Sequence, residues 1–295
     1  MTVGVGAVDN TCKAPSDAGS MAIILISRGT MSGVTPLTDS LSKAIGYRSV
    51  SREDLVARVN EHGEIANRIV ESIGNATRAY EQFSRLRRPY VILMRLALLE
   101  YAEQDNLIYH GYSGHLLIPA FRHVLRVRIN APLPMRIRTT MAHFRCTEEE
   151  AVEKIQTEDE NRGRWARFMY GRDIRHTGLY DLILNLQRMS VPAACRLLGC
   201  AANEPELQPL PETLQEVQEL LLATRVEAAL VTDSRTSTHE IEAKVKGQTI
   251  QLVGPYLEDD QRALVCQVAQ SESGDKRVEY EAGCAAIFEP VIDAD

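Results

Sequence analysis

The segment Ala22–Gly46, AIILISRGTMSGVTPLTDSLSKAIG, decides the fold. It begins with Ala22–Ile26, a short continuous apolar run, which is typical of a strand buried on both faces of a parallel sheet. A loop that contains glycine follows. Thr35 and Pro36 then predict the start of a helix, with Thr35 as its N-cap. A strand, a loop and a helix in this order are typical of the opening of a nucleotide-binding α/β domain.

The same alternation continues along the chain. Helical patterns occupy roughly 51–60, 63–84 and 89–103, and a capping box at Thr147–Glu150 begins a long polar helix that extends to about Phe168. Further strands are predicted at Leu107–Tyr109, Val124–Ile129 and Tyr180–Leu186, and a closing helix at Ser190–Leu198. Strands separated by helices predict an α/β fold with a doubly wound, mostly parallel sheet.

Composition and charge divide the chain into units. We predict a disordered leader over 1–20, a first domain over 21–200, and a linker over 201–211 that holds three prolines. A second domain follows over 212–289 with the order α-β-β-α-β, and 290–295 form a tail. Residues 212–295 carry 7 basic and 17 acidic residues, a net charge of −10, whereas 1–211 carry +3. This asymmetry suggests two units with different partners, and we expect 212–289 to fold on its own.

The sequence also argues against several classes of protein. Ala22–Ile26 is the longest apolar run, far shorter than the roughly 20 residues of a membrane-spanning helix, so the chain is not expected to span a membrane. Its first residues lack the charged-then-apolar order of a signal peptide, and we expect a cytoplasmic protein. Six scattered cysteines without a CxxC pair do not predict a structural zinc site.

The loop after the first strand is a candidate phosphate site. A P-loop reads G-x-x-x-x-G-K-[ST], where backbone N–H groups and the lysine contact phosphates and the hydroxyl binds Mg²⁺. Aligning Gly33 and Thr35 with the second glycine and the hydroxyl residue places Arg28 at the first glycine and Val34 at the lysine. The glycine and the hydroxyl are present, and the lysine is absent. A plain strand–turn–helix without a ligand is the alternative.

Arginine dominates residues 1–211, where the lysines are Lys13, Lys43 and Lys154. Arginine suits bidentate recognition of phosphate, so this composition favours a domain that binds phosphate groups. The alternative is that these arginines form the solvated faces of surface helices.

Five segments in order resemble the cytidylate-kinase-like family of nucleoside monophosphate kinases. Ala22–Gly46 lies where that family typically has an I-S-R-x-x-G-S-G-G loop, and Asn106–Leu117, NLIYHGYSGHLL, lies where it has a G-R-G or G-R-D turn. The other segments are VLRVRINAPLPMRIR (Val124–Arg138), CTEEEAVEKIQTEDENRGRWARFMYG (Cys146–Gly171) and YDLILNLQRMS (Tyr180–Ser190). The resemblance covers about residues 21–200.

This resemblance implies a P-loop kinase-like domain with a helical lid. By analogy with the family, Ser32, Gly33 and Thr35 would hold the phosphates of ATP, with Thr35 on Mg²⁺. Arg136 would lie near the phosphates. Arg162, Arg164 and Arg167 would be lid arginines that close over the transferring phosphoryl group, with Asp159 ordering the lid. Arginines in this role neutralise phosphoryl oxygens. A basic face of a surface helix is the alternative for these arginines.

The sequence departs from the family pattern at the phosphate loop and at the acceptor turn. Val34 removes the cation that would bridge the β and γ phosphates, and Arg28 is the residue that could replace it, unless it pairs with an acid. Tyr112 and Ser113 stand where cytidylate kinases have an Arg-Asp that contacts the nucleoside monophosphate. Loss of one preorganised charge costs on the order of 10²–10³ in rate, so these departures leave catalysis open.

The C-terminal unit resembles a BON domain, on the segments IQLVGPYLEDDQRALVCQVAQ (Ile250–Gln270) and KRVEYEA. Such domains are usually associated with phospholipid or oligomer contacts, which implies a protein partner, a lipid or a small ligand. The net charge of −10 argues against anionic membranes and against nucleic acid. We therefore favour a protein-interaction or ligand-sensing module over a domain that only packs on the first.

Two functions follow from these observations. The first is a phosphotransferase that moves a phosphoryl group from ATP to a nucleoside monophosphate, CMP or dCMP before others, with Mg²⁺. The second is a non-catalytic nucleotide sensor whose BON-like unit signals to a partner. Val34, Tyr112 and Ser113 favour the sensor, and Thr35 with the lid arginines favours the enzyme.

Overall fold

The computed structural model describes residues 22–74, 84–103 and 106–283. The predicted leader 1–20 and tail 290–295 lie outside these residues. No helix in the described part combines the length and the apolarity that crossing a membrane requires.

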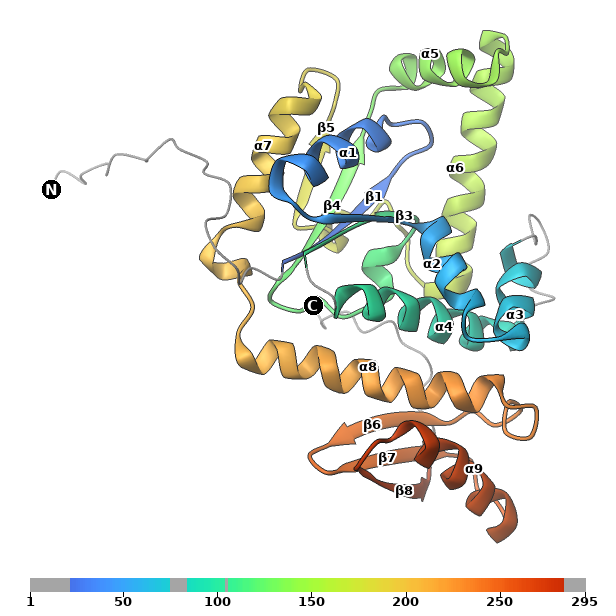
Figure 1. The fold of residues 1–295 in the computed structure, drawn as a ribbon. Helices are drawn as coiled ribbons and strands as arrows, with labels where there is room; N and C mark the ends of the chain where they lie inside the picture. Colours follow the sequence, from blue (N-terminus) through green and yellow to red (C-terminus); the bar gives the residue numbers. More distant parts are fainter. Residues whose placement is uncertain (1–21, 75–83, 104–105, 284–295) are drawn as a thin grey trace, which may run out of the picture.

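A five-stranded parallel sheet forms the centre of the first domain (Figure 1). Its strands run in the spatial order β2-β3-β1-β4-β5, and every neighbouring pair is parallel. Their bounds are β1 (Ile23–Arg28), β2 (Arg48–Ser51), β3 (Leu107–Gly111), β4 (Val124–Asn130) and β5 (Leu182–Asn185). The predicted parallel α/β sheet is therefore confirmed.

The central strand β1 separates two hydrophobic cores, because its side chains alternate between the two faces of the sheet. Ile24 and Ile26 join the core beneath α1 (Val34–Ile45) and α7 (Val191–Ala202). Ile23 and Leu25 join the larger core beneath α2 (Arg52–Asn60), α3 (Glu64–Gly74) and α4 (Ser84–Ala102). Burial on both faces explains why β1 reads as a continuous apolar run.

The structure corrects three local predictions. The helix after β1 begins at Val34, and its N-cap is Gly33 in the left-handed region with φ 79°, so Thr35 is not the N-cap. Strand β2 was not predicted, because Val50 is its one fully buried residue. Helix α5 (Leu133–Phe144) was not predicted either.

Helices α5 and α6 (Glu148–Tyr170) follow each other closely in the sequence, and α5 lies across the N-terminal end of α6 (Figure 1); the pair is here called the lid hairpin. The predicted capping box is present: Thr147 Oγ1 accepts from Glu150 N–H at 3.3 Å, and Glu150 Oε2 accepts from Thr147 N–H at 2.8 Å. The N-terminal half of α6 packs on α5 through a small core of its own. Its C-terminal end is fixed to the main domain, where Trp165 lies edge-on to Tyr90 at 5.5 Å and Arg87 Nε donates to the Met169 carbonyl at 2.9 Å.

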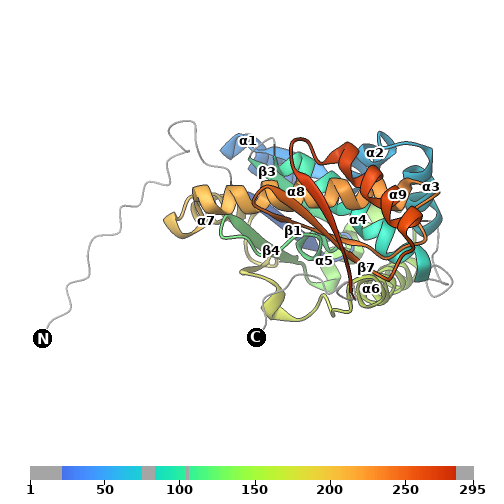
Figure 2. The ribbon, with the colours of Figure 1, turned by 90° about the horizontal axis from the view of Figure 1, so that it is seen from below.

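The C-terminal unit has the predicted α-β-β-α-β order. It consists of α8 (Pro211–Thr232), β6 (Glu242–Lys246), β7 (Thr249–Gly254), α9 (Asp259–Glu272) and β8 (Arg277–Ala282). β6 and β7 form an antiparallel hairpin, and β8 lies parallel to β7. Figure 2 shows this small sheet and α9 in front of α8. The assignment of the unit to the BON family stays a prediction.

Helix α8 belongs to both units. Val217 and Leu221 are buried in the larger core of the first domain, whereas Val226 and Leu230 are buried in the C-terminal core. Between them the carboxylate of Glu227 is buried, where it accepts from Ala243 N–H at 3.0 Å and pairs with Arg88 at 3.5 Å. The expectation that 212–289 folds alone stays a prediction, and such a fragment would expose the face of α8 that holds Leu221.

A shared helix predicts that the two units unfold together. Leu221 is 2 % exposed, so Leu221→Ala should lower the free energy of unfolding by about 2–5 kcal/mol. Urea denaturation followed by circular dichroism should show one transition, displaced as a whole. Leu210→Ala, at the exposed start of the same helix, is the control and should change stability by less than about 0.5 kcal/mol. Two transitions, of which Leu221→Ala moves one, would contradict the shared core.

His115 predicts a loss of stability in acid. The residue is 4 % exposed, neither ring nitrogen has a hydrogen-bond partner, and burial lowers its pKa to about 3. A histidine whose pKa is lower in the folded state binds protons better when unfolded, so stability falls as the pH drops from about 6.5 towards 3. His115→Phe should retain more of its neutral-pH melting temperature at pH 4.5 than the wild type does. Equal acid sensitivity of the two proteins would contradict this role of His115.

Candidate functional site

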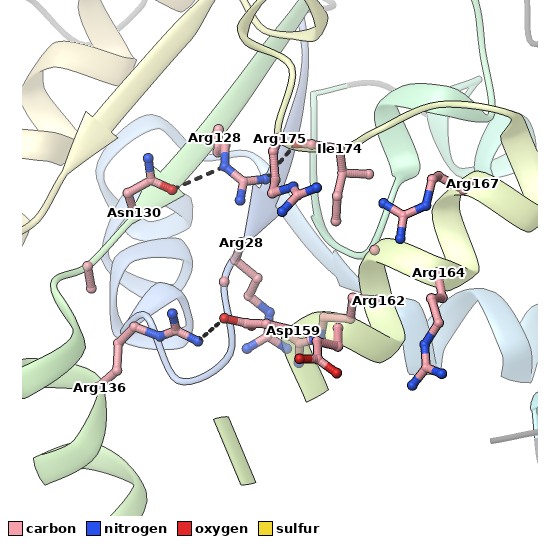
Figure 3. Close-up of a pocket in the computed structure, with 14 residues that line it drawn as sticks. Arg28, Arg128, Asn130, Arg136, Asp159, Arg162, Arg164, Arg167, Ile174 and Arg175 are labelled. Carbon is pink, nitrogen blue, oxygen red and sulfur yellow. Dashed lines mark hydrogen bonds and ion pairs between the residues drawn. The ribbon is translucent and has the colours of Figure 1, made fainter. Parts of the chain in front are cut away.

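A pocket of about 510 Å³ opens at the carboxyl ends of β1 and β4 (Figure 3). The chain leaves β1 towards β2 at one edge of the sheet, and it leaves β4 towards β5 at the other. Connections that diverge in this way leave a crevice between two neighbouring strands, which is where open α/β sheets bind ligands. The position of the pocket therefore follows from the strand order.

Positive charge dominates the lining of this pocket. Seven arginines and two carboxylates contribute to it. The arginines are Arg28, Arg128, Arg136, Arg162, Arg164, Arg167 and Arg175, and the carboxylates are Asp159 and Glu160. A pocket with this composition suits an anion with several negative oxygens.

Asp159 joins the lid hairpin to the loop after β1. Its Oδ1 accepts from the Thr30 N–H at 3.2 Å and from the Thr30 hydroxyl at 2.8 Å. Its Oδ2 pairs with Arg136 Nη2 at 2.6 Å, and Arg136 Nε donates to the Thr30 carbonyl at 2.7 Å. Burial raises the pKa of Asp159, but the hydrogen bonds from Arg136 and Thr30 outweigh it and hold the pKa below its usual value. The carboxylate is therefore charged at neutral pH.

Arg162 is held against the turn that follows β3. Its Nη2 donates to the Tyr112 hydroxyl at 2.5 Å, and its guanidinium carbon lies 4.0 Å from the centre of the Tyr112 ring. Glu158 lies 3.3 Å away on the same helix. Burial lowers the pKa of Arg162, and the positive charge of Arg28 acts in the same direction. Tyr112, a departure from the family pattern, thus positions a predicted lid arginine.

Two arginine N–H groups in the pocket lack a partner. Arg28 Nε and Arg162 Nη1 are both buried, and neither makes a hydrogen bond within the described structure. Buried donors are almost always paired, and leaving one unpaired costs about 1–3 kcal/mol. Two such donors on neighbouring like charges indicate a place where an anion belongs.

The other predicted lid arginines line the same pocket at its exposed side. Arg164 donates to Asn161 at 2.7 Å, and Arg167 lies 3.9 Å from Asp173 with half of its side chain exposed. A bound anion would therefore compete only with these contacts for the two guanidinium groups.

One of the four predicted cofactor-binding residues lines the pocket, and three do not. Arg28 lines the pocket, whereas Ser32, Gly33 and Thr35 are not among its lining residues. Ser32 is fully buried and its hydroxyl has no partner, and Thr35 is exposed in the first turn of α1. The structure thus brings together Arg28, Arg136, Asp159 and the three lid arginines, but not the predicted Mg²⁺ ligand Thr35.

The residues present fit a polyphosphate better than a tightly held metal. The unpaired donors of Arg28 and Arg162 suit phosphate oxygens. Within the described ranges, no group of three His, Cys, Asp or Glu side chains could hold a metal ion. A Mg²⁺ ion here would take most of its ligands from phosphates and water, as Mg²⁺ commonly does.

Arg128 and Arg175 were missed by the sequence prediction. Arg128 is the last arginine of β4, and Arg175 lies between α6 and β5. The signal for Arg128 was present, because a polar side chain near the carboxyl end of a buried parallel strand points to the ligand-binding edge of the sheet. No comparable signal marks Arg175, because its segment has no periodicity.

Comparison with known proteins identifies the family of the first domain. The model of the Cytidylate kinase-like family matches residues 23–188. A cytidylate kinase of Ignicoccus hospitalis is 26% identical over 176 residues, which cover 59% of this chain and 94% of that protein. One from Pyrococcus abyssi is 24% identical over 182 residues, covering 61% and 93%.

Solved structures give weaker likenesses. An uncharacterized protein from Eubacterium ventriosum aligns with a TM-score of 0.49 at 14% identity, over 62% of this chain and 99% of that one. A shikimate kinase from Bacteroides thetaiotaomicron aligns with a TM-score of 0.38 at 15% identity, over 62% and 99%. The family model, in contrast, spans more than half of the sequence, from β1 through β5. The chain belongs to the cytidylate kinase-like family.

Proposed function

We propose that the chain transfers a phosphoryl group from ATP to a nucleoside monophosphate, with CMP or dCMP as the first acceptors to test. The observation that carries the proposal is the pair of buried, unpaired donors, Arg28 Nε and Arg162 Nη1, in a pocket lined by seven arginines. Membership of the family supports a nucleotide kinase. A cytoplasmic location remains a prediction.

Arg28 takes the place of the missing lysine in this proposal. It stands at the end of β1, where the phosphate loop begins, and it forms no ion pair within the described residues. Its charge is therefore available to phosphate oxygens. Ser32 and the start of α1 would hold the remaining phosphates, and Mg²⁺ bound to ATP would neutralise part of their charge.

The lid arginines would act on the charge that develops during transfer. Arg162 is already fixed by Tyr112, and Arg136 is fixed by Asp159 and Thr30. Because the C-terminal end of α6 is anchored on the main domain, these groups need little reorganisation when the phosphates bind. Preorganised charge is the main source of rate acceleration in phosphoryl transfer.

A second candidate is a nucleotide sensor without turnover. It is favoured by Val34 at the lysine position and by Thr35, which lies outside the pocket. In this case the C-terminal unit, through α8, would pass the bound state to a protein partner, a lipid or a small ligand. That unit's BON-like character belongs to the same proposal.

The Arg162→Ala variant separates these two functions. In an enzyme, Arg162 meets charge that develops during transfer, so kcat should fall by about 10²-fold or more while ATP affinity changes little. A coupled ADP-release assay across the nucleoside monophosphates measures this. Arg138→Ala, an exposed arginine of α5 outside the pocket lining, is the control and should retain the wild-type rate. In a sensor, turnover is absent throughout and Arg162→Ala weakens nucleotide binding by about 1.5–3 kcal/mol.

The Arg28→Gln variant tests the proposed replacement for the lysine. Loss of a charged hydrogen bond to phosphate should weaken ATP·Mg²⁺ binding by about 1.5–3 kcal/mol. Calorimetry of the full chain measures this directly, again with Arg138→Ala as the control. Unchanged affinity in Arg28→Gln would remove Arg28 from the site.

A further inference from the structure

The pocket has two ends. At one end Arg28, Arg136 and Arg162 surround the loop after β1 and Asp159 (Figure 3). At the other end lie Arg128 from β4 and Arg175 from the segment between α6 and β5. The end formed by Arg128 and Arg175 is not used by the roles proposed so far.

Arg128 carries a positive charge that no carboxylate balances among the residues described in the structure. Its Nε donates to Asn130 Oδ1 at 3.1 Å, and its Nη1 donates to the Ile174 carbonyl at 2.9 Å and to the Tyr180 hydroxyl at 3.2 Å. Its guanidinium carbon lies 5.6 Å from the centre of the Tyr180 ring. All of these partners are neutral. They fix the guanidinium at the pocket wall and leave its charge uncompensated.

Arg126, on the same strand, is an arginine whose charge is paired within the protein. It lies two residues earlier on the same face of β4, where its Nε and Nη2 donate to the two oxygens of Asp181 at 3.3 and 2.8 Å. It does not line the pocket. The contrast makes Arg126 a matched control for Arg128.

The residues next to Arg128 add to the excess charge. Arg175 directly follows Ile174, the residue whose carbonyl accepts a hydrogen bond from Arg128. The Nη2 of Arg175 pairs with Asp173 at 2.7 Å, and 73% of the Arg175 side chain is exposed. The same Asp173 lies 3.9 Å from Arg167. One carboxylate therefore serves two arginines, and with Arg128 this end of the pocket keeps a net charge of +2. A phosphate monoester dianion has the complementary charge.

We infer that Arg128 and Arg175 form a second anion subsite, which binds the phosphate monoester of the acceptor. The assignment of the ligand as the acceptor rests on the proposed function. Arg28 ends β1 and Arg128 lies near the end of the neighbouring strand β4, with Ser27 opposite Arg128 and Arg28 opposite Ile129 in the sheet register. Two phosphate groups held at these strand ends lie in one pocket, as transfer between them requires.

Inorganic pyrophosphate is the probe that does not depend on the acceptor's identity. Calorimetry of the full-length protein should give two pyrophosphates per chain. Arg128→Gln and, separately, Arg175→Gln should each leave one, with at least a tenfold loss of affinity at the other. Arg126→Gln should bind two. Melting temperatures are measured for all variants, and the exposed Arg175 provides a variant whose folding is not at risk.

A second measurement identifies the ligand of the subsite. Both variants should weaken CMP binding by at least tenfold and change ATP·Mg²⁺ affinity by less than twofold. An equal loss of ATP·Mg²⁺ and CMP binding, or unchanged pyrophosphate binding in both variants, overturns the subsite. A chain that transfers no phosphoryl group but loses one pyrophosphate in both variants keeps the subsite and refutes only the kinase function.

Discussion

The carboxylate of Asp159 is the contact on which the arrangement of the site depends. It joins three segments that lie far apart in the sequence: the loop after β1 through Thr30, helix α5 through Arg136, and its own helix α6. Hydrogen bonds that involve a charged group are about twice as strong as neutral ones, and here four bonds close a ring through Arg136 and Thr30. Without this carboxylate, Arg136 and the loop would have no common partner.

That ring has a consequence for the other arginines. It neutralises Arg136, and even with Glu158 beside Arg162 and Asp173 shared by Arg167 and Arg175, the lining arginines keep an excess of positive charge. Holding several guanidinium groups together in a half-buried pocket costs free energy, since their charges repel and burial removes water from them. The lowered pKa of Arg162, caused by burial and by the charge of Arg28, reports this cost. A bound polyanion would return that free energy, so the charge distribution of this pocket favours one.

The sheet could be predicted because β1 and β3 are buried on both faces and therefore read as apolar runs, and because β4 alternates apolar residues with arginines. The sequence was insufficient for β2, an edge strand with the sequence RSVS, and for α5, whose start PLP reads as a break in a helix. Arg28, Arg136, Asp159 and Arg162 were predicted together and lie in one pocket. Thr35 is not the N-cap that the sequence predicted, because the helix begins one residue before it, and its role as a Mg²⁺ ligand stays a prediction. Arg175 could not be found, because only the folded chain brings its irregular segment beside β4.

Helix α8 shows a second limit of prediction from the sequence. Its apolar residues indicate that it is buried, but they do not indicate that it packs into two separate cores. Its burial between two cores makes it the mechanical connection between the units. From Glu227 the contacts continue to Arg88, and the charge of Glu227 also acts on the buried Arg95. Arg95 Nε donates to the Leu117 carbonyl at 2.7 Å, at the end of the turn that holds Tyr112.

This route ends at Arg162, because Tyr112 is the residue that positions it. A ligand of the C-terminal unit can change the affinity for a nucleotide only if the protein has two conformations. The ligand must then bind one of these conformations more tightly than the other. Any arrangement that moves α8 must also break or carry with it the buried contacts of Glu227, Arg88 and Arg95. The contacts named here therefore lead from α8 to the segment that holds Tyr112 and Leu117, and not to the phosphate loop.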